Sequence, residues 1–208
     1  MADDLLALFP LPNVVLFPRV ALPLHIFEPR YREMVADVRA AEGRIGMVLL
    51  RPDGAPEPGG DPPIFPVGCG GSIGRFELLE DGRSNLVLEG ERRFRIVREV
   101  PGRAYRRAEV DWLGDGEEER SAFELPADLL AAAEEVLRRD GRTFKGRLAD
   151  HLPEEPAVLV NSLAAALEFS VVEKMALLEC ASAAERATRL RDLLQFRLAG
   201  SADSGTLQ

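Results

Sequence analysis

The apolar pattern of this 208-residue sequence changes character near residue 112. Before that point, short apolar runs are separated by prolines and glycines, which is typical of strands joined by tight turns. Beyond it, apolar residues recur at helical spacing. A chain that changes period in this way is expected to fold as strands followed by helices. The predicted fold class is therefore α+β.

Short strands are expected to fill the first half of the chain. Pro10, Pro12 and Pro18 cannot donate a ladder hydrogen bond, so the runs beside them belong at edges, bends or strand ends. One helix is expected among the strands, with Pro29 in its first turn and Gly43 after its end. The predicted strands are Leu5–Phe9, Val14–Phe17, Ala21–Phe27, Arg44–Leu50, Val67–Leu79, Asn85–Glu89, Phe94–Val100 and Ala108–Trp112.

Glycines predict how these strands turn. Gly68, Gly70, Gly71 and Gly74 crowd one strand, which suits a sharp bend at the corner of a closed sheet. Gly90 is expected to separate two strands. Strands this short and closely spaced predict a closed or nearly closed antiparallel sheet. Residues 51–63, RPDGAPEPGGDPP, are predicted to form a surface loop, with a substrate lid as the alternative.

The second half is predicted to be helical. Pro126 and Pro156 can each open a helix, and Ser170-x-x-Glu173 and Ser182-x-x-Glu185 are capping boxes that start two more. Phe144–Leu152 is a weaker helical candidate. The expected organisation is a β domain at residues 1–113, an acidic linker at 114–123, a helical bundle at 124–200 and a disordered tail at 201–208.

The net charge of −9 limits the partners of the chain. Nucleic-acid binding needs a basic face, and the nearest basic cluster, at residues 92–98, is expected to be the solvated face of a strand pair. Cys69 and Cys180 lie far apart in apolar surroundings, which favours a reducing compartment. No apolar stretch reaches the roughly 20 residues of a membrane span, and the acidic N-terminus does not resemble a signal peptide. The expected location is the cytoplasm, with neither membrane nor nucleic acid as partner.

The residues of known catalytic machinery are missing from the sequence. Lys145 and Lys174 are the only lysines, and neither stands between Gly and Ser or Thr as a Walker loop requires. Lys174 is expected to be a solvated helix charge rather than part of a Ser–Lys pair. A nucleophilic site would need His25 or His151, and no Gly-x-Ser-x-Gly elbow is expected; the alternative is an enzyme in which the fold brings one histidine to Cys69 or Cys180.

The segment GCGGSIG at Gly68–Gly74 is interpreted as a bent strand rather than a phosphate loop, because no helical pattern follows it. Two cysteines and two histidines scattered along the chain offer no metal-ligand spacing. We therefore expect no enzymatic activity, no cofactor and no metal.

Five stretches, taken together, resemble the N-terminal substrate-binding domain of Lon proteases. FPLPNVVLFP at Phe9–Pro18 and LPLHIFEPRY at Leu22–Tyr31 are similar to the start of that domain, where the second stretch leads into the first helix. The strand at Val67–Gly74, LVLEGERRFRI at Leu86–Ile96 and the helical stretch Glu173–Leu194 are similar in place and order. The resemblance rests on the order and spacing of the set, over about residues 5–198.

This resemblance implies a PUA-like antiparallel pseudo-barrel with one helix, followed by an α-helical bundle. It implies a free-standing module without the ATPase and peptidase modules of full Lon proteases, so proteolysis is not expected. It implies instead recognition of unfolded or tagged polypeptide, as an adaptor in protein quality control, with a protease or chaperone as a further partner. A PUA-like binder of a small molecule or RNA is the alternative.

Aromatic side chains near loops are the candidate peptide contacts. Such side chains dominate the binding energy of many interfaces, which favours Phe65, Phe76 and Trp112. Core packing is the alternative for each of them.

The segment from Glu28 to Tyr31 matches a motif of the resembling family, and its expected role is structural. Pro29 is expected to start the helix and Tyr31 to pack it. Arg30 is expected to pair with a carboxylate such as that of Glu89.

Overall fold

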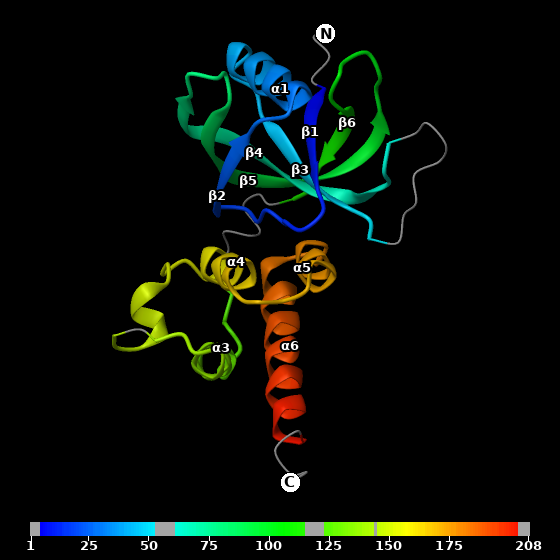
Figure 1. Cartoon of the computed structure of the whole chain (residues 1–208). Helices are drawn as coiled ribbons and strands as arrows, with labels where there is room; N and C mark the ends of the chain where they lie inside the picture. Colours follow the sequence, from blue (N-terminus) through cyan, green and yellow to red (C-terminus); the bar gives the residue numbers. More distant parts are fainter. Residues whose placement is uncertain (1–4, 53–60, 115–122, 144, 204–208) are drawn as a thin grey trace. The chain divides into compact units, whose positions relative to one another are not determined.

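The computed structural model describes residues 5–52, 61–114, 123–143 and 145–203, with side chains as far as residue 200 (Figure 1). The chain divides into two compact units, Met1–Asp115 and Gly116–Gln208. Strands occupy the first unit and helices the second, apart from one helix in the first, so the α+β class is confirmed. Most of the predicted linker at 114–123, the end of the predicted tail and the middle of the loop at 51–63 lie outside the described residues.

The strands of the first unit form one mixed sheet that closes into a ring. Its order is β2-β5-β4-β3-β1-β6, and a further pairing of β5 with β6 joins the two ends of the run β5-β4-β3-β1-β6. β1 and β3 run parallel because β2 and a helix lie between them in the chain. The expectation of a purely antiparallel sheet is wrong at this pair. The elements are β1 (Leu6–Leu11), β2 (Ala21–Ile26), α1 (Pro29–Ala40), β3 (Ile45–Leu50), β4 (Ile64–Leu78), β5 (Ser84–Glu99) and β6 (Arg107–Trp112).

β5 is one strand of 16 residues, where two strands separated at Gly90 were expected. On one edge, the first half of β5 pairs with β2 and the second half with β6. On the other edge, β5 pairs with β4 over most of its length. Gly90 does not end the strand but admits a crossing segment, since a Cβ there would lie 2.2 Å from the carbonyl oxygen of Phe17. Gly90 N–H also donates to the Val20 carbonyl at 2.9 Å. The expectation that Gly90 separates two strands is therefore wrong: the glycine permits a close approach of backbone within one strand.

The same crossing segment explains why the strand predicted at Val14–Phe17 is absent. Leu16 and Phe17 are buried, but the backbone after them turns at Arg19, whose φ is +62°. Arg19 N–H donates to the Gly90 carbonyl at 2.8 Å. The backbone of this segment therefore hydrogen-bonds to the sheet at Gly90, and it does not form a strand ladder.

Apolar side chains fill the ring and fix α1 against its outside. The core cluster consists of Leu6, Leu8, Val48, Phe94 and Ala108. On the opposite face of β1, the ring of Phe9 lies 4.4 Å from that of Tyr31, the first buried residue of α1. Met34, Val35 and Val38 continue this buried face at helical spacing. The helix thus lies beside β1, as Figure 1 shows.

The helices of the second unit pack around the longest of them, α6 (Figure 1). Pro156 opens α4, and the capping box of Ser170 and Glu173 opens α5, both as predicted. α3 begins three residues after Pro126, and Phe144–Leu152 forms only one turn of 3-10 helix in its described part. Among the described residues, no helix is both long and apolar enough to cross a membrane. The helices are α3 (Leu129–Arg139), η1 (Leu148–His151), α4 (Pro156–Ala166), α5 (Val171–Leu178) and α6 (Ala183–Asp203).

A fully buried arginine joins three of these helices. The guanidinium of Arg186 on α6 donates to the Leu177 carbonyl of α5 at 2.9 Å and to the Asn161 side-chain oxygen of α4 at 2.8 Å. A buried charge is tolerated only when such acceptors surround it. These bonds fix the relative positions of the three helices.

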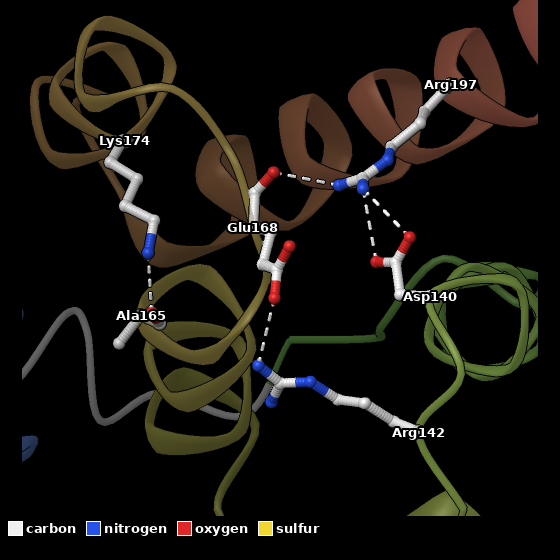
Figure 2. Close-up of polar contacts among 6 residues, drawn as sticks. All are labelled: Asp140, Arg142, Ala165, Glu168, Lys174 and Arg197. Carbon is white, nitrogen blue, oxygen red and sulfur yellow. Dashed lines mark hydrogen bonds and ion pairs between the residues drawn. The ribbon is translucent and has the colours of Figure 1, made fainter.

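A second group of polar contacts, drawn in Figure 2, holds the ends of α3 and α4 against α6. Arg197 on α6 donates to both carboxylate oxygens of Asp140 at 2.9 and 3.1 Å, and to the Glu168 carbonyl at 2.8 Å. The Glu168 carboxylate in turn accepts from Arg142 at 3.4 Å.

Lys174 does not occupy the solvated position that was expected. It is half-buried, and its Nζ donates to the Ala165 carbonyl in the last turn of α4 at 2.6 Å (Figure 2). Burial lowers the pKa of this amine because it disfavours the charged form. Lys174 therefore satisfies the exposed carbonyl end of the preceding helix.

Replacing Gly68 tests how tightly the ring is closed. A Cβ at this position would lie 2.4 Å from the Met47 carbonyl oxygen and 2.6 Å from the Phe94 ring, so backbone must move. We expect Gly68→Ala to lower the free energy of unfolding by at least about 3 kcal/mol. Gly114→Ala, where nothing lies within 4 Å, should change it by less than about 0.5 kcal/mol. Urea unfolding followed by the fluorescence of Trp112 measures both; equal effects would contradict the close approach.

Replacing Arg197 tests the contact between helix ends. Arg197→Met should lower the free energy of unfolding by roughly 1–3 kcal/mol, because Asp140 and the Glu168 carbonyl lose a half-buried charged donor. Arg138→Met removes an exposed pair with Glu135 on α3 and should cost less than about 0.5 kcal/mol. Urea unfolding followed by circular dichroism at 222 nm compares the two. If Arg197→Met lowered the free energy of unfolding no more than Arg138→Met does, the contact between Arg197 and the helix ends would not stabilise the bundle.

Candidate functional site

A groove with a volume of about 740 Å³ lies beside the C-terminal end of α1. The start of β1, the last turn of α1 and the segment that joins β5 to β6 form its walls. Apolar and polar side chains share the lining, as in many ligand sites, which pair apolar contact area with a few orienting groups. The apolar part includes Leu5, Leu6, Val38, Ala40, Val100 and Trp112.

A tyrosine–aspartate hydrogen bond connects two walls of this groove. The Tyr105 hydroxyl, from the segment between β5 and β6, donates to Asp37 Oδ2 of α1 at 2.8 Å. Burial raises the pKa of Tyr105 to about 12, and the neighbouring Asp37 carboxylate adds to the effect by disfavouring a second negative charge. The bond holds the β5–β6 connection against the helix.

Three arginines line the groove, and they differ in how their charge is balanced. Arg44 donates to Glu91 Oε2 at 2.5 Å, and Arg103 lies 3.4 Å from Asp37 and 3.6 Å from Glu33. Burial raises and the Arg44 hydrogen bond lowers the pKa of Glu91, and the net effect is a lowered value. Asp37 is the one carboxylate among the lining residues, so the lining itself carries an excess of positive charge.

Arg107, at the start of β6, is the third of these arginines and has no balancing carboxylate. Its Nη2 donates to the Pro101 carbonyl at 3.0 Å. Its Nε is buried and has no hydrogen-bond acceptor among the residues that the structure describes. Within the described parts of the chain, no carboxylate oxygen lies within 4.0 Å of its guanidinium. Arg107 is thus the least compensated charge of the groove.

A smaller hollow of about 390 Å³ lies on the other side of the same helix end. Val38 and Gly43 line both spaces. In the smaller one, the guanidinium of Arg39 stacks 3.7 Å from the centre of the Phe76 ring, an attractive cation–π arrangement. This stacking covers part of the aromatic face that a ligand would need.

The three aromatic residues predicted as peptide contacts do not come together. Trp112 lines the groove, but it also packs edge-on against Phe94 at 5.9 Å between ring centres. Phe76 lines the smaller hollow. Phe65 lines neither space and lies 5.9 Å from the guanidinium of Arg51. Trp112 is therefore the predicted aromatic that the groove retains.

The motif residues at the start of α1 lie where they shape the helix. Glu28 is the N-cap, Pro29 occupies the first turn, and Tyr31 is buried against β1. Arg30 does pair with a carboxylate, but with that of Glu28 rather than Glu89: its Nε donates to Glu28 Oε2 at 3.0 Å, two residues away. Its guanidinium also lies 4.5 Å from the centre of the Tyr31 ring.

The two histidines lie beside an amide oxygen and a backbone carbonyl. His25 Nδ1 lies 2.7 Å from the Asn85 side-chain oxygen, and His151 Nε2 lies 2.6 Å from the Lys145 carbonyl. Cys69 and Cys180 are both buried. Within the described residues, no group of three His, Cys, Asp or Glu side chains could hold a metal ion.

Ser72 lies in a stretch that has the spacing of a nucleophile elbow without its geometry. Gly70-x-Ser72-x-Gly74 does have the spacing of a nucleophile elbow, although no elbow was expected. An elbow requires a sharp turn from a strand into a helix, whereas Ser72 lies inside strand β4. Its hydroxyl hydrogen-bonds the Glu91 carboxylate instead of a histidine. The motif therefore matches in letters and not in geometry.

The polar residues of the groove were missed by sequence reasoning. Asp37, Arg44, Arg103, Tyr105 and Arg107 come from four segments that the fold brings together. No local spacing links them, and each is ordinary in its own surroundings. The only available signal was the charge-rich stretch around Tyr105 between two predicted strands.

The ionisation of Tyr105 tests the contact between the groove walls. In Tyr31→Phe, Tyr105 is the only tyrosine left, and its absorbance at 295 nm should rise near pH 12 in the folded chain and near pH 10 in urea. Because the folded-state pKa is raised, the hydrogen bond should stabilise the fold fully below about pH 10 and lose its effect as the pH rises towards 12. A stopped-flow pH jump records absorbance before any unfolding. A folded-state midpoint near 10 would contradict the buried bond.

Comparisons with known proteins match this chain over nearly its whole length. The model of the family described as the ATP-dependent protease La (LON) substrate-binding domain matches residues 6–195. The Lon protease of Cytophaga hutchinsonii is 28% identical over 92% of this chain and 24% of its own length, and that of Paraburkholderia phytofirmans is 28% identical over 95% and 25%. The chain thus spans about a quarter of the length of these curated relatives.

Solved structures agree with the family match. The Lon N-terminal domain protein from Xanthomonas campestris is 27% identical, with a TM-score of 0.65 over 89% of this chain and 96% of its own. The N-terminal domain of a Mycobacterium avium complex Lon protease shares the fold, with a TM-score of 0.59 at 18% identity over 92% of this chain and 98% of its own. By its sequence match from residue 6 to residue 195, the chain belongs to the family of Lon substrate-binding domains.

Proposed function

We propose that this chain binds unfolded or tagged polypeptide, and that the groove beside α1 is the place of contact. The observation that supports the proposal is the match to a substrate-binding family over residues 6–195. The groove, at about 740 Å³, has the size of known ligand sites and could take a few side chains of an extended segment. Its mixed lining offers apolar area for side chains and polar groups for a peptide backbone.

The open edge of β2 is a poorer place for a polypeptide. β2 ends the strand order, so one of its edges is free to accept another strand. Pro23 stands in the middle of β2, opposite Val87 of β5, and has no N–H to offer to an added strand. A proline in an edge strand is a common protection against strand addition. The groove is therefore the better candidate.

The same proposal extends to the biological setting. Binding without hydrolysis suits an adaptor in protein quality control, delivering polypeptide to a protease or chaperone in the cytoplasm. The two buried cysteines are compatible with that reducing compartment.

In this proposal the β domain of residues 1–113 recognises polypeptide, and the helical bundle of residues 124–200 supports it. Phe76 and Phe65 have at most a secondary part in contact, because neither lines the groove.

A bulky side chain in the groove tests this proposal. Ala40 is an exposed groove-lining residue in the last turn of α1, and Ala36 is exposed on the same helix but lines neither hollow. The unaltered chain should bind dye-labelled unstructured peptides with a Kd on the order of micromolar. Ala40→Trp should weaken binding at least about tenfold by filling the space, whereas Ala36→Trp should leave it unchanged. Fluorescence anisotropy measures all three proteins.

The outcomes separate the candidates clearly. Absence of binding to every peptide would overturn polypeptide recognition, and equal binding by both variants would remove the groove from it. A gel shift at low salt against single-stranded RNA addresses the alternative function. Tight RNA binding there, without peptide binding, would favour that alternative. No hydrolysis of ATP or peptide is expected in either assay.

A further inference from the structure

Arg107 is held in place without a negative partner. It is half-buried at the start of β6, opposite Ala7 of β1. One end of its guanidinium is fixed by the Pro101 carbonyl at 3.0 Å, and a Cβ on Gly102 would lie 3.3 Å from Nη2. The side chain is therefore positioned by the turn that precedes it. A pre-positioned group loses little conformational freedom when it binds a ligand.

The rest of this guanidinium is available to an acceptor. Nε is buried without an acceptor, and a buried donor in that state is unfavourable. Nη1 has no acceptor among the described residues, and Arg107 is one of the residues that line the groove. An anionic oxygen near Nη1 would compensate a charge that the fold leaves unbalanced.

The surroundings extend the positive charge along the groove. Arg103 and Arg44 line it as well, with side chains that are 46% and 54% exposed. Their bonds to Asp37 and Glu91 are surface ion pairs, which exchange partners at little cost. Two exposed arginines and one unbalanced arginine thus face one space of about 740 Å³.

From this arrangement we infer that the groove recognises a carboxylate of the bound polypeptide, with Arg107 as its anchor and Arg103 as a second contact. The inference rests on the proposed polypeptide binding and gives its chemical preference. Guanidinium groups pair with carboxylates through charge-assisted hydrogen bonds, often two at once. The carboxylate can belong to an acidic side chain or to the C-terminus of the polypeptide, since both present the same group.

The acidic balance of the whole chain does not prevent this recognition. The net charge of −9 is spread over 208 residues, and exposed charges more than about 8 Å apart are largely screened at physiological salt. Contacts within the groove lie well inside that distance. Local charge therefore decides which ligand is held, while net charge mainly slows the approach of acidic peptides.

Three peptides that differ in one carboxylate test the inference. Each is unstructured, carries a neutral dye and shares one apolar sequence: the first has internal Glu and an amidated C-terminus, the second has Gln and an amidated C-terminus, and the third has Gln and a free C-terminus. Anisotropy titrations with the whole chain should show the first or the third binding roughly tenfold more tightly than the second. The peptide that gains affinity shows whether the recognised carboxylate is an acidic side chain or the C-terminus.

Variants of the chain assign the effect to the groove. Arg107→Gln should reduce the roughly tenfold preference to less than about twofold, and Arg103→Gln should reduce it in part. Arg83→Gln removes the same charge from an exposed hairpin residue, paired with Asp81, and should leave the preference intact. Circular dichroism checks that each variant is folded. If Arg107→Gln does not fold, Arg103→Gln decides, because its side chain is exposed.

Each result bears on one of the two proposals. Equal affinity for all three peptides would overturn carboxylate recognition and leave polypeptide binding standing. An equal loss of preference in Arg83→Gln would also overturn it, since the effect would then be one of net charge. Binding of single-stranded RNA more tightly than the Glu peptide would show that the arginines serve phosphate instead. Failure of every peptide to bind would overturn the proposed function itself.

Discussion

The ring of strands depends on backbone segments approaching more closely than a side chain allows. At Gly71 a Cβ would lie 2.4 Å from the Glu89 carbonyl oxygen, and at Gly90 it would lie 2.2 Å from that of Phe17. Gly68 has the same constraint against Met47. These contacts lie along β4 and β5, the two longest strands, which bend to meet partners on both edges. Without them β5 could not pair with both β2 and β6, and the ring would not close.

Closure of the ring fixes the position of α1, and α1 in turn shapes the groove. The helix is held near its start by the packing of Tyr31 on Phe9 and near its end by the hydrogen bond from Tyr105 to Asp37. The first contact is made by β1, and the second by the connection between β5 and β6. The C-terminal end of α1 is thereby held between two hollows, with Val38 and Gly43 lining both. The groove is a consequence of where the helix ends.

Local signals predicted most elements because their causes are local. Pro29 and Pro156 begin helices through their fixed φ, and the Ser170–Glu173 capping box satisfies the first backbone N–H groups of α5. The prediction failed where a segment that is distant in the sequence determines the local structure. The crossing chain at Gly90 looks like a strand break in sequence, because nothing nearby shows that Phe17 will lie against it.

The same limit applies to single side chains. Lys174 follows a polar pattern, yet the end of α4 lies close enough to bury it. The groove arginines could not be selected from so many others, because their shared surroundings exist only after folding. Sequence therefore indicates the class of fold and the helix ends, while the pairing of β1 with β3 and the lining of the groove require the three-dimensional arrangement.

The arginines of the two units show how structural and binding roles differ. In the helical unit, Arg197 donates to the Asp140 carboxylate and to the Glu168 carbonyl, so its charge is balanced within the fold. Arg107 donates to the Pro101 carbonyl, but no carboxylate oxygen of the described residues lies within 4.0 Å of its guanidinium. Desolvating part of a charged group without a counter-charge is unfavourable for folding alone. A ligand that supplies the missing charge is the physical reason we assign to such an arrangement at the wall of a groove.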